Sequence, residues 1–128
     1  MTAEIVSIPI MPVEDIYKAA DFYNRALALE TTYLHEGTDE TEATNYAILQ
    51  RGDLIVHLIL DEPPPYSEPW TKAGVGRLYL KVGDADKLFG EVRTSGVEIM
   101  RGLQTENWGA SGFDLTDPSG NAVHIEQG

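Results

Sequence analysis

The chain has 128 residues, enough for one domain with its own core and too few for two independent domains. Its formal charge of −12, from 21 acidic and 9 basic residues, argues against a nucleic-acid partner, because phosphate backbones are bound by clustered Lys and Arg. The lack of cysteine excludes disulfides and thiolate metal sites, and without a secretion signal or long apolar segment we expect a cytoplasmic protein with no membrane partner.

The first half of the chain is predicted to form a strand, a helix and three further strands. Asp15 suits the N-terminal cap of a helix, and apolar residues at helical spacing follow it: Ile16, Ala19, Ala20, Tyr23 and Leu27. The segments 31–35, 45–50 and 54–60 have strand patterns. Residues 51–53, Arg-Gly-Asp, join the last two strands as a hairpin.

The second half repeats this order. Asp84 is a candidate cap for a helix that ends at Gly96, and strand patterns follow at 97–100, 112–116 and 122–126. A proline-rich linker, 61–74, separates the halves, so one domain (1–128) is predicted to contain a module at 4–60 and another at 75–127. Each module is small for independent stability, so the two should pack together or pair across a dimer.

Two segments resemble a known family. The opening IPIMPVEDIYKAADFYNRALALE and the closing WGASGFDLTDPSGNAVHIEQ are similar to the vicinal oxygen chelate superfamily, the glyoxalase and bleomycin-resistance proteins, and the closing segment is most similar to the bleomycin-resistance branch. The resemblance implies an α+β fold of two βαβββ modules, with curved mixed sheets around a cup. It also implies a homodimer, with or without a segment exchanged between the copies.

Many members of that superfamily bind a divalent metal through the first and last strands of each module. Counted from the helix caps, the corresponding first-strand residues are Ile8 and Arg77, and the last-strand residues are His57 and His124. A metal needs three or four converging donors, and a guanidinium repels a cation, so we expect no metal and no other cofactor. The alternative is a metal held by His57 and His124 with Glu126 or water as a third donor.

Four strand residues are candidates for ligand binding. His124 shares a strand face with Glu126, and is either a residue facing the cup or a structural histidine with a backbone partner. His57 is expected to be a partly buried structural histidine, with ligand binding as the alternative. Arg77 and Tyr79 share a face, where the arginine could meet a carboxylate or aromatic ligand or pair with Glu126.

Three further aromatic residues complete the candidate set. Trp108 lies in a polar, glycine-rich segment and is expected to be an exposed wall of a ligand site or of a dimer interface. Trp70, in the linker, forms an opposing wall or anchors the linker. Phe113 shares a strand face with Leu115 and is expected in the core, with ligand stacking as the alternative.

These observations support two functions of different class. The first is metal-independent sequestration of a planar, cationic small molecule, such as a glycopeptide antibiotic of the bleomycin type, in a groove of a dimer. The acidic charge, Trp108 and the incomplete metal set favour it. The second is a metal-dependent glyoxalase, lyase or dioxygenase of the same superfamily. No nucleophile motif or phosphate-binding loop supports hydrolase or nucleotide chemistry.

Overall fold

Each half of the chain contains one helix and four strands in the computed structural model, which describes residues 5–35, 44–61 and 72–128. The first half has β1 (Ile10–Val13), α1 (Ile16–Leu27), β2 (Glu30–His35), β3 (Tyr46–Arg51) and β4 (Leu54–Leu60). The second has β5 (Arg77–Val82), α2 (Ala85–Ser95), β6 (Ile99–Thr105), β7 (Ser111–Thr116) and β8 (Ala122–Gln127). Neither helix of these ranges is long and apolar enough to cross a membrane.

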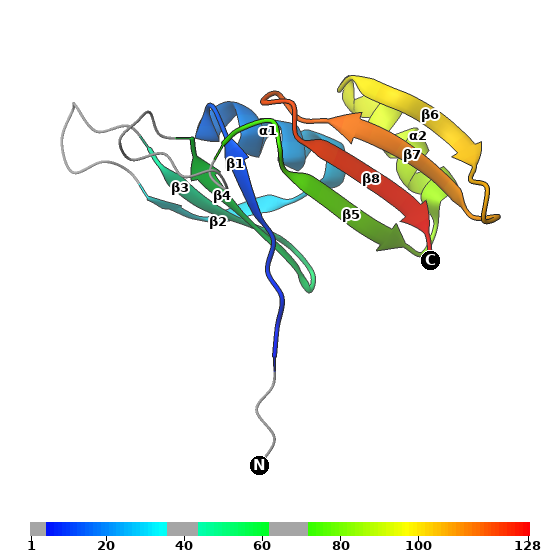
Figure 1. The fold of residues 1–128 in the computed structure, drawn as a ribbon, viewed down its shortest axis with the longest axis horizontal. Helices are drawn as coiled ribbons and strands as arrows, with labels where there is room; N and C mark the ends of the chain where they lie inside the picture. The colour runs from blue at the N-terminus through cyan, green and yellow to red at the C-terminus, as the bar shows by residue number, and fades with distance from the viewer. Residues whose placement is uncertain (1–4, 36–43, 62–71) are drawn as a thin grey trace, which may run out of the picture.

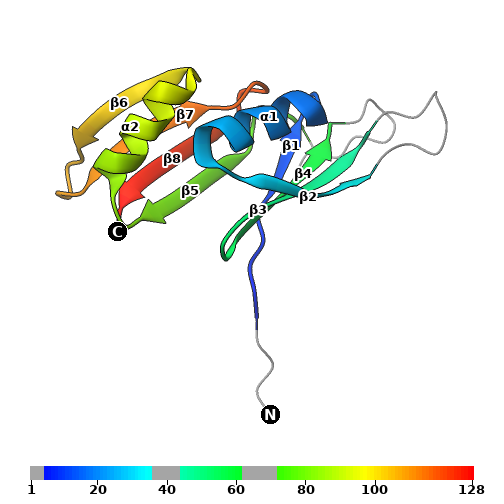
Figure 2. The same cartoon turned by 180° about the vertical axis from the view of Figure 1, so that it is seen from behind.

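The strands form two mixed four-stranded sheets, ordered β1-β4-β3-β2 and β5-β8-β7-β6. In each sheet the strand before the helix pairs in parallel with the last strand of its half, and the other pairs are antiparallel. The sheets lie side by side with β1 and β5 near the middle (Figure 1), and both helices lie on the same side of them (Figure 2). The predicted α+β architecture of two βαβββ modules is confirmed.

Local signals set the helix boundaries. The carboxylates of Asp15 and Asp84 each accept a hydrogen bond, 3.0 Å long, from the backbone N–H three residues later. At its other end α2 stops at Gly96, whose φ of 81° is left-handed. By contrast, α1 ends at Ala28, which adopts a φ of 53° although it has a Cβ. No glycine stands at this position to signal the helix end in the sequence.

The core lies between the helices and the sheet faces that they cover. In β8, Val123 and Ile125 are fully buried, whereas His124 lies on the uncovered face, as the predicted alternation requires. Side chains of both halves join in one cluster, whose largest fully buried apolar members are Tyr23, Phe113, Met11, Ile16, Leu29, Leu49, Leu58, Leu115 and Ile125. The halves therefore share one core and are not independent units.

A buried polar cluster joins the halves at the turn between β7 and β8. Asp117 and Asn121 are 3% and 0% exposed. Asp117 accepts from the hydroxyl of Tyr23 on α1 at 2.9 Å, and the Asn121 amide donates to Asp117 at 2.9 Å and to the carbonyl of Pro12 in β1 at 2.6 Å. Burial and the Asp117 carboxylate raise the pKa of Tyr23 far above its ordinary value of 10.0, so the hydroxyl keeps its proton.

Asn121 also fixes the start of the second module. Its carboxamide oxygen accepts from the backbone N–H groups of Gly74 at 3.0 Å and Gly76 at 2.8 Å. A Cβ on Gly76 would lie 2.8 Å from that oxygen, so the close approach requires glycine. The Asp-Pro-Ser-Gly-Asn segment, predicted only as a turn, is therefore also the junction between the modules.

Two strand predictions differ from the structure. β6 is longer than the predicted 97–100, because polar residues up to Thr105 continue to pair with β7 across two register shifts. β1 begins at Ile10, so Ile8 precedes it. Of the predicted linker, residues 62–71, including Trp70, lie outside the described residues.

Candidate functional site

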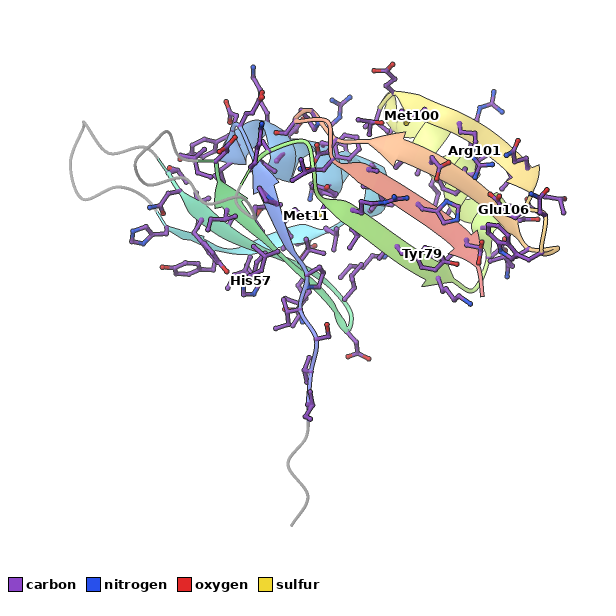
Figure 3. All side chains as sticks on the ribbon, viewed as in Figure 1. Met11, His57, Tyr79, Met100, Arg101 and Glu106 are labelled. Atoms are coloured by element: carbon purple, nitrogen blue, oxygen red, sulfur yellow. The ribbon has the colours of Figure 1, made fainter. Side chains whose placement is uncertain are left out.

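Four side chains form a row across the uncovered face of the second sheet. The strand register pairs Arg101 of β6 with Asp114 of β7, Asp114 with His124 of β8, and His124 with Tyr79 of β5. Cross-strand partners point to the same face, so a guanidinium, a carboxylate, an imidazole and a phenol lie next to one another. Figure 3 shows Arg101 and Tyr79 on opposite edges of this sheet.

Asp114 connects the middle of this row. Its Oδ1 lies 2.5 Å from Nδ1 of His124, and its Oδ2 accepts from Nε of Arg101 at 2.5 Å. Arg101 also donates from Nη2 to Glu106 and is therefore ion-paired with two carboxylates. Burial alone would raise the pKa of Asp114, but the hydrogen bonds from Arg101 and His124 outweigh it, and the pKa falls below its usual value of 3.8.

Glu126 holds the two aromatic residues of the site. This carboxylate is 2% exposed and accepts from the indole Nε1 of Trp108 at 2.7 Å and from the hydroxyl of Tyr79. The hydrogen bond from Tyr79, followed by those from Trp108 and His124, lowers the pKa of Glu126 against the effect of burial. Glu126 therefore stays ionised, and both rings are fixed through their polar atoms.

Gly112 makes room for these carboxylates. It lies opposite Glu126 in the β7–β8 register. A Cβ at this position would come within 3.1 Å of Glu106 Oε1 and 3.3 Å of His124 Cε1, so the missing side chain lets the polar groups approach one another.

The imidazole ring of His124 lies between the carboxylates of Asp114 and Glu126 and is hydrogen-bonded to both. Nδ1 faces Asp114, and Nε2 lies 3.4 Å from Oε1 of Glu126. An ionised carboxylate only accepts, so both ring nitrogens must donate, which requires the imidazolium form. Burial would lower the pKa of His124, but the hydrogen bonds and charges of the acidic neighbours outweigh it and raise the pKa above 6.5. His124 is thus a charged bridge between two acids.

This arrangement predicts a pH-dependent contribution to stability. Because the pKa of His124 is raised in the folded state, its contribution is complete below pH 6.5 and is lost as the pH rises through the folded pKa. The free energy of unfolding of the wild type, relative to His124→Gln, should therefore fall in urea titrations as the pH rises above 6.5 and through the folded pKa of His124. His57→Gln is the control, and its free energy of unfolding, relative to His124→Gln, should show the same decrease with pH as that of the wild type. A constant difference between the wild type and His124→Gln would contradict the charged bridge.

A cavity of about 530 Å³ opens over the row, lined in part by four sequence-predicted candidates: Arg77, Tyr79, Trp108 and His124. Trp108 is 65% exposed and Tyr79 54%, so their ring faces remain accessible although their polar atoms are bonded to Glu126. Met100 adds a third apolar wall. Another cavity, of about 390 Å³ between β5, α2 and the β3–β4 hairpin, has no aromatic or histidine among its described lining residues. The larger cavity is therefore the candidate binding site.

Arg77 lines this cavity but does not form the expected ion pair with Glu126. The register places Arg77 opposite Ala122, and Lys81 opposite Glu126. Four residues along β8 correspond to about 13 Å, too far for a direct contact. Among residues 5–35, 44–61 and 72–128, no carboxylate lies within ion-pair distance of the Arg77 guanidinium.

The first sheet carries an equivalent row of different chemistry. Its register aligns Ile10 of β1, His57 of β4, Ile48 of β3 and Tyr33 of β2. His57 is partly buried, and its Nδ1 lies 2.5 Å from the hydroxyl of Tyr46. The expected partly buried histidine is therefore present, on an apolar face rather than in a charged network.

The positions counted from the helix caps are not those beside the two histidines. The parallel registers place Ile10 beside His57 and Tyr79 beside His124, instead of Ile8 and Arg77. The count placed the row seven residues before each helix cap, whereas the strand register places it five residues before Asp15 and Asp84.

The side chains do not suit a divalent metal. The alternative metal set is divided between the sheets, because His57 lies on the first sheet and His124 and Glu126 lie on the second. Within the part of the chain that the structure describes, no three His, Cys, Asp or Glu side chains are placed to bind one ion. When both nitrogens of His124 donate to these carboxylates, the ring has no free lone pair for a metal.

Phe113 lies outside the cavity. It is fully buried on the covered face of β7, with its ring centroid 5.1 Å from that of Phe89, in the core position that its alternation with Leu115 predicts.

Sequence reasoning missed three charged residues of the site, Arg101, Glu106 and Asp114, and its apolar wall Met100. Asp114 lies between the buried residues Phe113 and Leu115, and this alternation was the available signal that it points to the uncovered face. Its partners Arg101 and His124 come from other strands, so the sequence offered no comparable signal for the contacts themselves.

The comparisons with known proteins agree with this fold. Residues 5–125 match the model of the Glyoxalase/Bleomycin resistance protein/Dioxygenase superfamily. The chain belongs to this family. A search of curated protein sequences finds no match.

Among solved structures, proteins described as bleomycin-resistance, bleomycin-binding or antibiotic-binding proteins share the fold. The bleomycin resistance determinant encoded on transposon Tn5 has 23% sequence identity and a TM-score of 0.71, over 97% of this chain and 98% of that one. A bleomycin-binding protein complexed with bleomycin has 22% identity and a TM-score of 0.70 (98% and 99%). TnmS3, an antibiotic binding protein from Streptomyces sp. CB03234, has 23% identity and a TM-score of 0.70 (99% and 98%).

Proposed function

We propose that this protein sequesters a flat aromatic small molecule, an antibiotic of the bleomycin type, in the cavity over the second sheet without a metal. The observation that carries the proposal is the pair of exposed rings, Tyr79 and Trp108, bonded through one buried carboxylate, Glu126. Rings that are already held in place lose little conformational freedom when a ligand stacks on them. The site therefore suits binding and needs no chemical step.

Two further observations support the proposal: the partners of His124, which argue against a bound metal, and the ligands of structurally similar proteins. Both nitrogens of His124 face carboxylates. Structurally similar proteins include a bleomycin-binding protein and an antibiotic binding protein.

The overall charge of −12 favours a cationic ligand through the long-range field. Each acidic side chain of the site, however, is already bonded within the protein, so the preference for a cation rests on that field alone.

A second copy of the chain is the proposed cover for the uncovered face of the first sheet. That face presents Ile10 and Tyr33, 53% and 48% exposed, together with partly buried Ile48 and Ile59. Apolar side chains in such a row are stabilised by burial against another surface. If the second sheet of the partner copy supplies this cover, the ligand groove lies between two copies, and the molar mass from light scattering should equal that of two chains.

Calorimetric titration of chelator-treated protein with metal-free bleomycin tests the function. The proposal expects saturable binding of metal-free bleomycin with the chelator present. After the chelator is removed, titration of the protein alone with Zn²⁺, Mn²⁺ or anaerobic Fe²⁺ should show no saturable binding. Stoichiometric metal binding that is abolished by His57→Ala with His124→Ala would instead support the metal-dependent glyoxalase or dioxygenase alternative.

A further inference from the structure

The charges around the cavity are paired unevenly. Arg101 is bonded to Asp114 and Glu106, and His124 lies between Asp114 and Glu126. Each of these acids therefore already accepts from at least one cationic group of the protein. Arg77 is the cation of the cavity wall without a carboxylate partner in the described ranges.

This pairing decides which ligand charge the site can bind directly. A cationic group would have to compete with Arg101 or His124 for a carboxylate, and Glu126 is 2% exposed and already accepts from Tyr79 and Trp108. An anionic or strong acceptor group would meet the exposed guanidinium of Arg77, which gives up no ion pair with a described residue. The cavity wall therefore favours an anionic ligand group, whereas the negative net charge of the protein attracts cations.

The geometry of β5 relates this guanidinium to the aromatic wall. Arg77 and Tyr79 are two residues apart on one strand and lie on the same face, which separates their Cα atoms by about 7 Å. That distance is about the width of a fused two-ring aromatic system. A ligand whose ring packs on Tyr79 or Trp108 can thus place a ring substituent at Arg77.

We infer that the cavity selects flat aromatic molecules that carry a carboxylate or comparable acceptor, and that Arg77 is the residue that binds this group. The inference rests on the proposed function and specifies the ligand class of the same site. Tyr79 and Trp108 supply the stacking surface, and Arg77 fixes the orientation of the ligand.

The test uses three probes of one shape: 2-naphthoate, 2-naphthamide and 2-naphthylmethylammonium. Each is titrated in 0.15 M salt, which screens the net charge beyond about 8 Å. Binding is measured by calorimetry and by emission of Trp108 in a Trp70→Phe background. The naphthoate should bind about tenfold more tightly than the amide and the ammonium probe. Arg77→Gln should remove this preference, and Arg77→Lys should keep part of it.

Lys81→Gln is the matched control, because it removes one positive charge from the same face of β5 away from the lining of this cavity. It should leave the preference for naphthoate unchanged. Equal binding of the three probes, or equal losses for Arg77→Gln and Lys81→Gln, overturns the inference and leaves the proposed function standing. If no probe binds, the inference also fails, and the proposed function fails with it when metal-free bleomycin does not bind either.

Discussion

Asp117→Ala is expected to lower the free energy of unfolding by about 3 kcal/mol. Asp117 is 3% exposed and accepts from the Tyr23 hydroxyl, from the Asn121 amide and from the backbone N–H groups of Ser119 and Asn121. Removing the carboxylate leaves these buried donors without a partner at the junction between the modules. Urea unfolding followed by circular dichroism measures the loss.

Tyr23→Phe and Asp21→Ala make this test specific. Tyr23→Phe removes one donor and keeps the ring, so a loss of about 1–2 kcal/mol is expected even if Asp117→Ala does not fold. Asp21 is an exposed aspartate whose only described ion pair, with Arg25, spans one helical turn at 3.6 Å, so Asp21→Ala should change stability by less than about 0.5 kcal/mol. An Asp117→Ala protein as stable as Asp21→Ala would show that the junction does not stabilise the fold.

Trp108→Ala should weaken ligand binding about 30-fold, equivalent to about 2 kcal/mol. The indole is 65% exposed, yet its Nε1 is fixed on Glu126 at 2.7 Å, so it offers a wide apolar surface in one orientation. Truncation to alanine removes this apolar surface together with the hydrogen bond to Glu126 that orients it. The measurement is the dissociation constant of metal-free bleomycin by calorimetry, together with the unfolding free energy of the unliganded protein.

Two companion variants separate stacking from other effects. Trp108→Phe keeps a ring but loses the hydrogen bond to Glu126, and should weaken binding by a smaller factor, about fivefold. Tyr17 is an aromatic residue of α1, 56% exposed and distant from the cavity lining, so Tyr17→Ala should leave the affinity unchanged. Equal affinities of Trp108→Ala and the wild type would remove Trp108 from the ligand wall and contradict the proposed site.

Much of the fold was predictable because its signals are local. Asp15 and Asp84 start the helices within four residues of the N–H groups that they cap, and Gly96 supplies a left-handed end. The alternation of Val123, His124 and Ile125 assigned the faces of the last strand. Where no such signal exists, as at the left-handed Ala28, the sequence did not indicate the helix end.

The site was predictable only in part. The sequence by itself determined the two βαβββ modules, the family, and four residues that line one cavity: Arg77, Tyr79, Trp108 and His124. Turn residues and side-chain periodicity are signals between residues close together in the chain, so the sequence encodes the modules and the faces of their strands directly.

Only the tertiary structure decided which side chains meet. The pairing of His124 with Asp114, and of Asp114 with Arg101, depends on cross-strand registers that include two irregularities between β6 and β7. The bond between Trp108 and Glu126 joins a loop to a strand. A register is set by the packing of whole strands and by such irregularities, not by adjacent residues. The charged network, and an Arg77 without an ion pair to any described residue, therefore became visible only in the folded chain.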